Sequence, residues 1–232
     1  YLGHPVAAGA ERPLLQRMIR VLAHRGPDGC GFHVAPGVGL AHARLSIIDL
    51  ASGDQPIHNP ARTVWTVFNG EIFNFVELRA ELQAQGHVFH TRSDTEVIVH
   101  LYDRYGDRFV EHLNGQFAIA LWDGARRRLV LARDRAGIRP LYWTRAGGTL
   151  WFASEPAALF AALPDRARLS VQGLLQAFSY WAPLDPDTAW EGVQSLPPGH
   201  LLAIGADGRQ TLSQYWDWTF PPAAQTRPAC FT

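Results

Sequence analysis

The 232-residue chain carries 21 lysines and arginines and 21 aspartates and glutamates, so its formal net charge is zero. Balanced charge gives no electrostatic reason to expect nucleic acid or an anionic membrane as a partner. Hydrophobic residues make up 47% of the chain, but no apolar run is long enough to predict a membrane span. This composition is typical of one large globular domain.

Cysteine and histidine usage gives two further expectations. The two cysteines, Cys30 and Cys230, lie far apart in the sequence. They cannot build a disulfide framework, which favours a cytoplasmic location. The closest histidines, His87 and His90, have no third ligand at a matching spacing. We therefore expect no metal site.

The first part of the chain alternates between predicted helices and strands. Apolar residues recur at helical spacing over 11–24, which predicts a helix. Residues 39–50 and 63–68 are rich in β-branched and apolar side chains and predict strands. Asn74 can cap a second helix that ends near Gly86. The face that this helix is expected to bury consists of Val76, Leu78 and Leu82.

A third helix is expected to begin at Ser93-Asp-Thr-Glu96, which has the form of a capping box. In that motif each of the two side chains accepts a hydrogen bond from the other residue's backbone N–H. An apolar stripe follows, formed by Val97, Ile98, Leu101, Tyr102 and Tyr105.

The second half of the chain predicts mainly antiparallel strands. Hairpins are expected over 117–132, 141–153 and 201–215, with short helices after Ser154 and over 170–178. The sequence therefore predicts an α+β layered domain. We place this domain at 1–218 and interpret the proline-rich stretch 219–232 as a linker.

Three groups of polar residues have no evident local role. Arg44 ends an apolar stretch, and a buried guanidinium needs an anion. That anion is either an internal carboxylate such as Asp49 or the carboxylate of a ligand, which the guanidinium can grip through two hydrogen bonds.

The second group is Asn69-Gly70-Glu71, which follows a predicted strand. Asn-Gly is a common turn signal. It is also a compact way to direct a side-chain N–H₂ and a backbone N–H at a developing oxyanion. The third group is centred on Asp94, which either stabilises a helix N-terminus or binds a ligand ammonium. An Arg for a carboxylate and an Asp for an ammonium would together recognise a free α-amino acid.

Seven motifs occur in the order seen in glutamine-hydrolysing asparagine synthetases, which the chain resembles over roughly residues 20 to 155. They are His24-Arg-Gly-Pro-Asp28, Ala41-His-Ala-Arg-Leu-Ser-Ile-Ile-Asp49, Asn69-Gly-Glu-Ile-Phe-Asn74, Ser93-Asp-Thr-Glu96, Leu113-Asn-Gly-Gln-Phe-Ala118, Arg133-Asp-Arg-Ala-Gly-Ile-Arg-Pro-Leu-Tyr142 and Ala153-Ser-Glu155. The resemblance implies a class II glutamine amidotransferase domain with a four-layer αββα N-terminal-nucleophile hydrolase fold, two antiparallel sheets between helical layers.

The same resemblance implies roles for individual residues. Arg44 would bind the α-carboxylate of glutamine and Asp94 its α-ammonium, while Asn69 and Gly70 would form the oxyanion hole. The remaining lining of the pocket would come from Leu45, Ser46, Ile47, Ile48 and Glu71. No cofactor is expected in this domain. ATP and Mg²⁺ would act in a C-terminal synthetase domain of the same chain, which would amidate aspartate, and a homodimer is an open expectation.

The family's nucleophile is an N-terminal cysteine, and its α-amine, with a pKa of about 8, acts as the base. The sequence begins at Tyr1, so we expect a few residues including that cysteine to precede it, and the chain as given to be inactive. Alternatives are an amidotransferase domain that serves another carboxylate acceptor, and a non-catalytic relative that has lost the nucleophile, as in β-lactam synthetases. Phosphoribosylamine and glucosamine-phosphate synthases share the hydrolase fold, but the motifs around Arg44 and Asn69 resemble them less.

Overall fold

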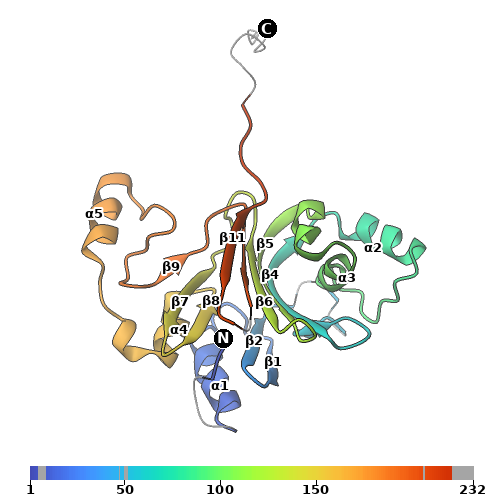
Figure 1. The fold of residues 1–232 in the computed structure, drawn as a ribbon, viewed down its shortest axis with the longest axis horizontal. Helices are drawn as coiled ribbons and strands as arrows, with labels where there is room; N and C mark the ends of the chain where they lie inside the picture. Colours follow the sequence, from blue (N-terminus) through green and yellow to red (C-terminus); the bar gives the residue numbers. More distant parts are fainter. Residues whose placement is uncertain (5–8, 47, 50–51, 206, 221–232) are drawn as a thin grey trace.

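The structure is a computed structural model that describes residues 1–4, 9–46, 48–49, 52–205 and 207–220. Its centre consists of antiparallel strands (Figure 1). One sheet has six strands in the order β11-β10-β6-β5-β4-β3. Their bounds are Gln210–Gln214 (β11), His200–Ile204 (β10), Arg128–Arg133 (β6), Gly115–Asp123 (β5), Val64–Ile72 (β4) and Ile57–His58 (β3).

The second sheet is built from two parts that the first residues of the chain join. One part pairs β1 (Gly29–Ala35) with β2 (Val38–Arg44), and the other has the order β8-β7-β9. Leu2 forms an antiparallel bridge to Val38 on one side and to Leu150 on the other. The bounds in the second part are Thr149–Ala153 (β8), Tyr142–Ala146 (β7) and Gln194–Ser195 (β9).

Helices cover the outer faces of both sheets. Helices α1 (Glu11–Val21) and α4 (Pro156–Ala162) contact β2 and β8, while α3 (Glu96–Tyr105) contacts β4 and packs against α2 (Phe75–Ala84). Helix α5 (Val171–Tyr180) stands apart from these layers (Figure 1). Two 3₁₀ helices complete the elements, Gly106–His112 after α3 and Pro164–Arg166 after α4.

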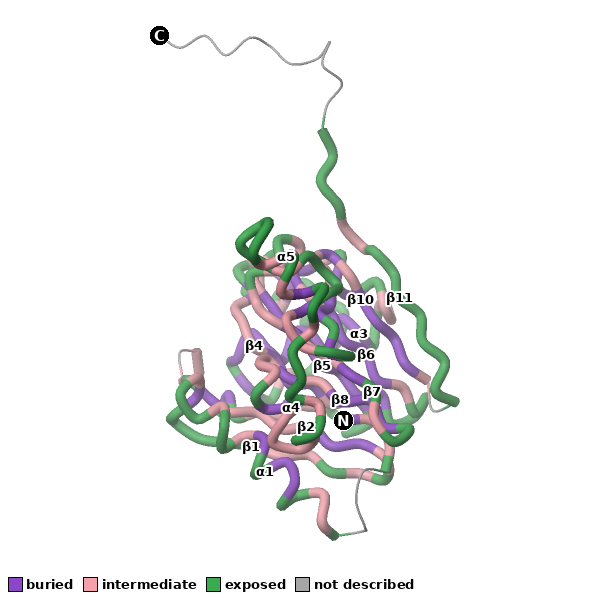
Figure 2. The backbone as a smooth tube through the Cα atoms, turned by 90° about the vertical axis from the view of Figure 1, so that its left-hand side faces the viewer, coloured by how far each residue is buried: buried purple, intermediate pink, exposed green. Residues whose placement is uncertain are grey.

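Three apolar clusters fill the spaces between these four layers, because side chains alternate along each strand. In β5, Phe117 and Ile119 point toward α3, whereas Ala118 and Ala120 point toward the other sheet. The third cluster lies between α1, α4 and β8 and includes Leu15 and Trp151. The buried parts of the chain follow the central strands (Figure 2). Burial of each large apolar side chain stabilises the folded state by roughly 1.5–3 kcal/mol. The two-residue period of the strands decides which face each side chain lies on, and therefore which layers pack together.

Most predicted elements are present, with five corrections, of which the first four concern helix and strand ends and the second helix. The helix expected over 11–24 ends at Val21, and the strand expected over 39–50 ends at Arg44. Val76, expected on the buried face of α2, is exposed, because only Leu78 and Leu82 face the core. Asn74 precedes α2 as expected, but its side chain bonds the backbone of His112 and Asn114 and does not cap the helix.

The predicted capping box is also wrong. Glu96 is the first residue of α3, and no side chain caps this helix. The Glu96 carboxylate accepts the backbone N–H groups of His90 and Thr91, so it fixes the preceding loop and does not close the box with Ser93. Within the described ranges, no helix is long and apolar enough to cross a bilayer.

Candidate functional site

A cavity of about 350 Å³ lies where β2 and β4 end and the loop before α3 passes, a volume suited to a small ligand. Seven of the predicted site residues line it together: Arg44, Leu45, Ile48, Asn69, Gly70, Glu71 and Asp94. Ser46 is absent from the lining, and its backbone N–H donates to the Asp28 carboxylate over 2.7 Å. Ile47 lies outside the described residues.

Arg44 supplies a buried positive charge to this cavity. Its Nη1 contacts Asp54 Oδ1 at 2.5 Å and its Nη2 donates to the Asp49 carbonyl oxygen at 2.6 Å. Asp54 therefore provides an internal carboxylate for Arg44, and Asp49 provides its backbone carbonyl oxygen. The Asp54 side chain is 83% exposed, whereas that of Arg44 is 10% exposed. A guanidinium has five N–H donors, so Arg44 can bind a further anion or exchange the exposed Asp54 for one.

Asp94 supplies the opposite charge. The carboxylate is buried and accepts the Ile72 backbone N–H at 3.0 Å and the Ser93 hydroxyl at 3.3 Å. Burial raises the pKa of Asp94 above its ordinary value, and the charge of Glu71 adds to this rise, while the hydrogen bonds from Ile72 and Ser93 oppose it. A nearby cation stabilises the charged form of a buried carboxylate, so the site favours a bound cation.

Asn69 and Gly70 do not form the turn that their residue types suggest. Both lie within β4, where Asn69 pairs with Ala118 and Gly70 with Phe117. Gly70 has a φ of 155°, and a Cβ there would come within 1.9 Å of the Gln116 carbonyl oxygen, so only glycine fits. The Asn69 Nδ2 atom is buried without a hydrogen-bond partner. An unpartnered buried donor is costly, and a ligand acceptor would satisfy it.

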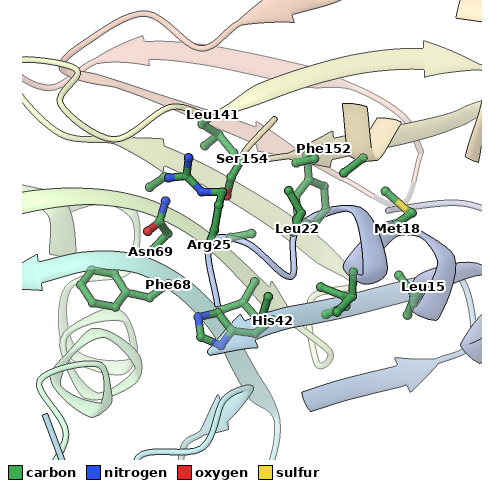
Figure 3. Close-up of a pocket in the computed structure, with 18 of the residues that line it drawn as sticks. Leu15, Met18, Leu22, Arg25, His42, Phe68, Asn69, Leu141, Phe152 and Ser154 are labelled. Atoms are coloured by element: carbon green, nitrogen blue, oxygen red, sulfur yellow. The ribbon is translucent and has the colours of Figure 1, made fainter. Parts of the chain in front are cut away.

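A second cavity of about 110 Å³ adjoins the first and shares Arg25, His42 and Asn69 with it. Figure 3 shows Asn69 and Arg25 at one side of this cavity, with the apolar side chains of Leu15 and Met18 across from them. Burial lowers the pKa of His42 to about 4, outweighing a backbone hydrogen bond with Phe68, so this imidazole is neutral at pH 7. Its Nδ1 is also unpartnered.

The site includes residues that the sequence predictions did not assign. Arg25 lines both cavities and donates to Glu155 Oε1 at 3.0 Å. This hydrogen bond connects the motif at 24–28 with the motif at 153–155. Gln55 accepts the Phe68 N–H at 2.7 Å and donates to the Thr95 hydroxyl at 3.3 Å, so it ties β4 to the loop carrying Asp94. Motif membership could have indicated Arg25, whereas no sequence signal marks Gln55.

Among the described residues no cysteine lines either cavity, and Cys30 is exposed on β1. Across the portion of the chain that the structure describes, no group of three or more His, Cys, Asp or Glu side chains is arranged to hold a metal ion. The cavity therefore offers the guanidinium groups of Arg25, Arg44 and Arg139, the carboxylates of Glu71 and Asp94, and the free amide donor of Asn69. This set matches a zwitterionic amino acid with a second polar group.

Comparison with known proteins agrees with this chemistry. The glutamine amidotransferase domain model matches residues 3–216. Asparagine synthetase (glutamine-hydrolysing) 1 of Bacillus subtilis is 38% identical over 220 residues, which are 94% of this chain and 35% of that protein. Amidase chry2 of Gibberella zeae is also 38% identical, over 94% of this chain and 32% of its own length. The chain thus spans about a third of the length of these relatives.

Solved structures agree on the fold. The B. subtilis glutamine phosphoribosylpyrophosphate amidotransferase complexed with ADP and GMP superimposes with a TM-score of 0.66 at 20% identity, over 93% of this chain and 48% of that one. A structure of the allosteric regulatory enzyme of purine biosynthesis gives a TM-score of 0.68 with the same identity and coverage. The chain therefore belongs to the glutamine amidotransferase domain family, has the N-terminal-nucleophile hydrolase fold, and is homologous to the glutaminase domains of asparagine synthetases.

Proposed function

We propose that this chain is the glutaminase domain of an asparagine synthetase, which releases ammonia from glutamine for the ATP-dependent amidation of aspartate in a second domain. The observation that carries the proposal is one cavity that combines Arg44, Asp94 and the unpartnered Asn69 amide. Arg44 grips the α-carboxylate of glutamine, and Asp94 and Glu71 attract its α-ammonium. The side-chain amide then lies toward Asn69 and Gly70.

The proposed reaction is acyl transfer to a cysteine thiol. The thiolate attacks the amide carbon, and the oxyanion accepts hydrogen bonds from Asn69 Nδ2 and the Gly70 N–H. The cysteine's α-amine, which takes the thiol proton, returns it to the amide nitrogen, so that ammonia leaves when the C–N bond breaks. Water then hydrolyses the thioester to glutamate and the free thiol. We assign the nucleophile to an N-terminal cysteine of the complete protein, as the family resemblance implies. ATP and Mg²⁺ would act in the second domain.

The direct test is a product assay on the full-length protein with glutamine, aspartate, ATP and Mg²⁺. Glutamate and asparagine are expected to form in equal amounts. Glutamate formed without asparagine would keep the glutaminase assignment and overturn the acceptor. If neither product formed, the whole proposal would be wrong.

Replacing Arg44 or Asp94 by Ala is expected to raise KM for glutamine about 10- to 100-fold, because each removes a hydrogen bond to a charged group. Synthesis from added ammonium should remain, since it bypasses the cavity. Arg108→Ala is the matched control, because its ion pair with Glu111 is on the surface and away from the site. Equal losses of glutamine- and ammonium-dependent synthesis would contradict these roles.

Glutamine use should also depend on pH through Asp94. Its pKa is raised, so protonation begins at a higher pH than for an ordinary aspartate. The protonated carboxyl no longer attracts an ammonium, so KM should rise about tenfold as the pH falls through this raised pKa. Asp94→Asn should have the high KM at every pH. A pH profile of KM that is the same in both proteins would exclude this role.

A further inference from the structure

Helix α5 and the segment after it form an exposed apolar surface without charge. Residues 169–184 contain no Asp, Glu, Lys, Arg or His. Within α5 only Gly173 is buried, while Val171, Leu175 and Phe178 are exposed at spacings that place them on one helix face. The α5 surface, as we call it, consists of Leu169, Val171, Leu175, Phe178, Tyr180, Trp181 and Leu184, each at least half exposed.

Hydrogen bonds on the polar side of α5 fix the helix in the orientation that exposes its apolar face. Ser170 caps the helix by accepting the Gly173 N–H at 3.1 Å. A Cβ at Gly173 would come within 1.9 Å of the Thr188 carbonyl oxygen, which shows how closely the helix approaches the following segment. Gln176 donates to Asp187 at 2.8 Å and accepts the Leu184 N–H at 2.9 Å. The apolar face therefore cannot turn inward without breaking these contacts.

We propose that the α5 surface is the docking site for the synthetase domain of the same polypeptide. This inference rests on the proposed function, which requires a second domain. The relatives that match are about three times longer than this chain, so most of their length lies outside the region matched here. In both views α5 and the segment that leaves β11 lie at the same end of the molecule (Figures 1 and 2).

The chemistry of the surface fits a permanent interface. Phe178 is 87% and Trp181 is 96% exposed. Interface cores are depleted in charged residues and enriched in aromatic ones, and buried Trp and Tyr side chains carry much of the binding energy. The departing segment adds Trp218 and Phe220, which are also exposed. Several large apolar side chains exposed on one short segment are typical of a binding site for another apolar surface.

The α5 surface is connected to the glutamine cavity through Arg133. Asp185, directly after the surface, lies 3.4 Å from Arg133 Nη1. Arg133 also donates to the carbonyl oxygens of Gly137 at 2.8 Å and Arg139 at 2.9 Å. Arg139 lines the cavity. A domain bound on α5 would therefore lie next to Asp185, which Arg133 links to a residue of the cavity lining.

The test is thiol labelling of the full-length protein with a maleimide. Phe178→Cys is compared with Val88→Cys, a matched exposed position after α2, both in a Cys30→Ala, Cys230→Ala background. Labelling is located by peptide mass spectrometry, and thermal unfolding confirms that each variant folds. Cys at 178 is expected to react at least tenfold more slowly than Cys at 88.

The outcomes distinguish the possible occupants. Protection of position 178 that persists when the protein is diluted to a monomer supports docking within one chain. Protection that disappears on dilution assigns the surface to a second copy and overturns the proposal, as do equal labelling rates. Labelling requires no turnover, so protection in a protein that makes no asparagine would keep the docking site and overturn only the proposed function.

Discussion

Replacing Asn69 by Ala in the full-length protein is expected to lower kcat for glutamine hydrolysis about 10²- to 10³-fold, the usual effect of removing one oxyanion-hole donor. KM should change little, because the donor matters most when negative charge develops on the oxygen. The Asn69 amide nitrogen has no partner in the folded chain, so its removal leaves no buried group newly unsatisfied. The variant should therefore unfold at nearly the temperature of the parent protein.

Asn114→Ala provides the matched control. This asparagine is exposed and lies in the loop before β5, where its backbone makes the hydrogen bonds to Phe73 and Asn74. Its kcat should equal that of the parent protein. A rise in KM with unchanged kcat for Asn69→Ala would show that Asn69 binds the ground and transition states equally, and would remove it from the oxyanion hole.

Local patterns predicted the elements well wherever one face of a segment is buried against a neighbouring layer. The stripe of α3 is an example, since Val97, Ile98, Leu101 and Tyr102 are all buried. The hairpin of β5 and β6 was also predicted, because its alternating side chains and its turn lie within one short stretch. In these cases the same residues that form the element also form the core.

The site was harder to predict because its residues depend on distant partners. Asn69-Gly70 reads locally as a turn, but ladder pairing with β5 keeps both residues extended. Arg44 contacts the carboxylate of Asp54, ten residues away, and the backbone carbonyl oxygen of Asp49. Gln55 has a role only because β4 and the Ser93–Asp94 loop meet in space. Sequence spacing contains no information about contacts between segments that are distant in the sequence.

Glu96 shows how the core supports the site. Its carboxylate is fully buried, accepts two backbone N–H groups and the Thr91 hydroxyl, and contacts His90 at 2.6 Å and His100 at 3.4 Å. Thr91 Oγ1 in turn accepts the Ser93 N–H, and Ser93 Oγ donates to Asp94. A continuous set of hydrogen bonds therefore links Glu96 to the residue proposed to bind the ammonium.

Glu96→Ala is expected to reduce the free energy of unfolding by about 3–5 kcal/mol, because it leaves the buried donors around the carboxylate unsatisfied. Urea denaturation measures this loss. Val76→Ala, an exposed α2 position, is the control and should change stability by less than about 0.5 kcal/mol. A loss for Glu96→Ala no larger than that of the control would show that the carboxylate network does not stabilise the fold.

The same network predicts how stability depends on pH. Burial alone would raise the pKa of Glu96, but hydrogen bonds from His100, Thr91 and the His90 backbone outweigh it and lower the pKa from 4.5 to about 2. Because the folded pKa lies below the unfolded one, this stabilisation is present above pH 4.5 and is lost as the pH falls through about 2. The full contribution is about 3 kcal/mol. Glu96→Gln has no carboxylate to titrate at this position. The difference in unfolding free energy between the parent protein and Glu96→Gln should therefore narrow by about 3 kcal/mol as the pH falls from 4.5 to about 2. A difference that stays constant over this pH range would show that Glu96 titrates normally.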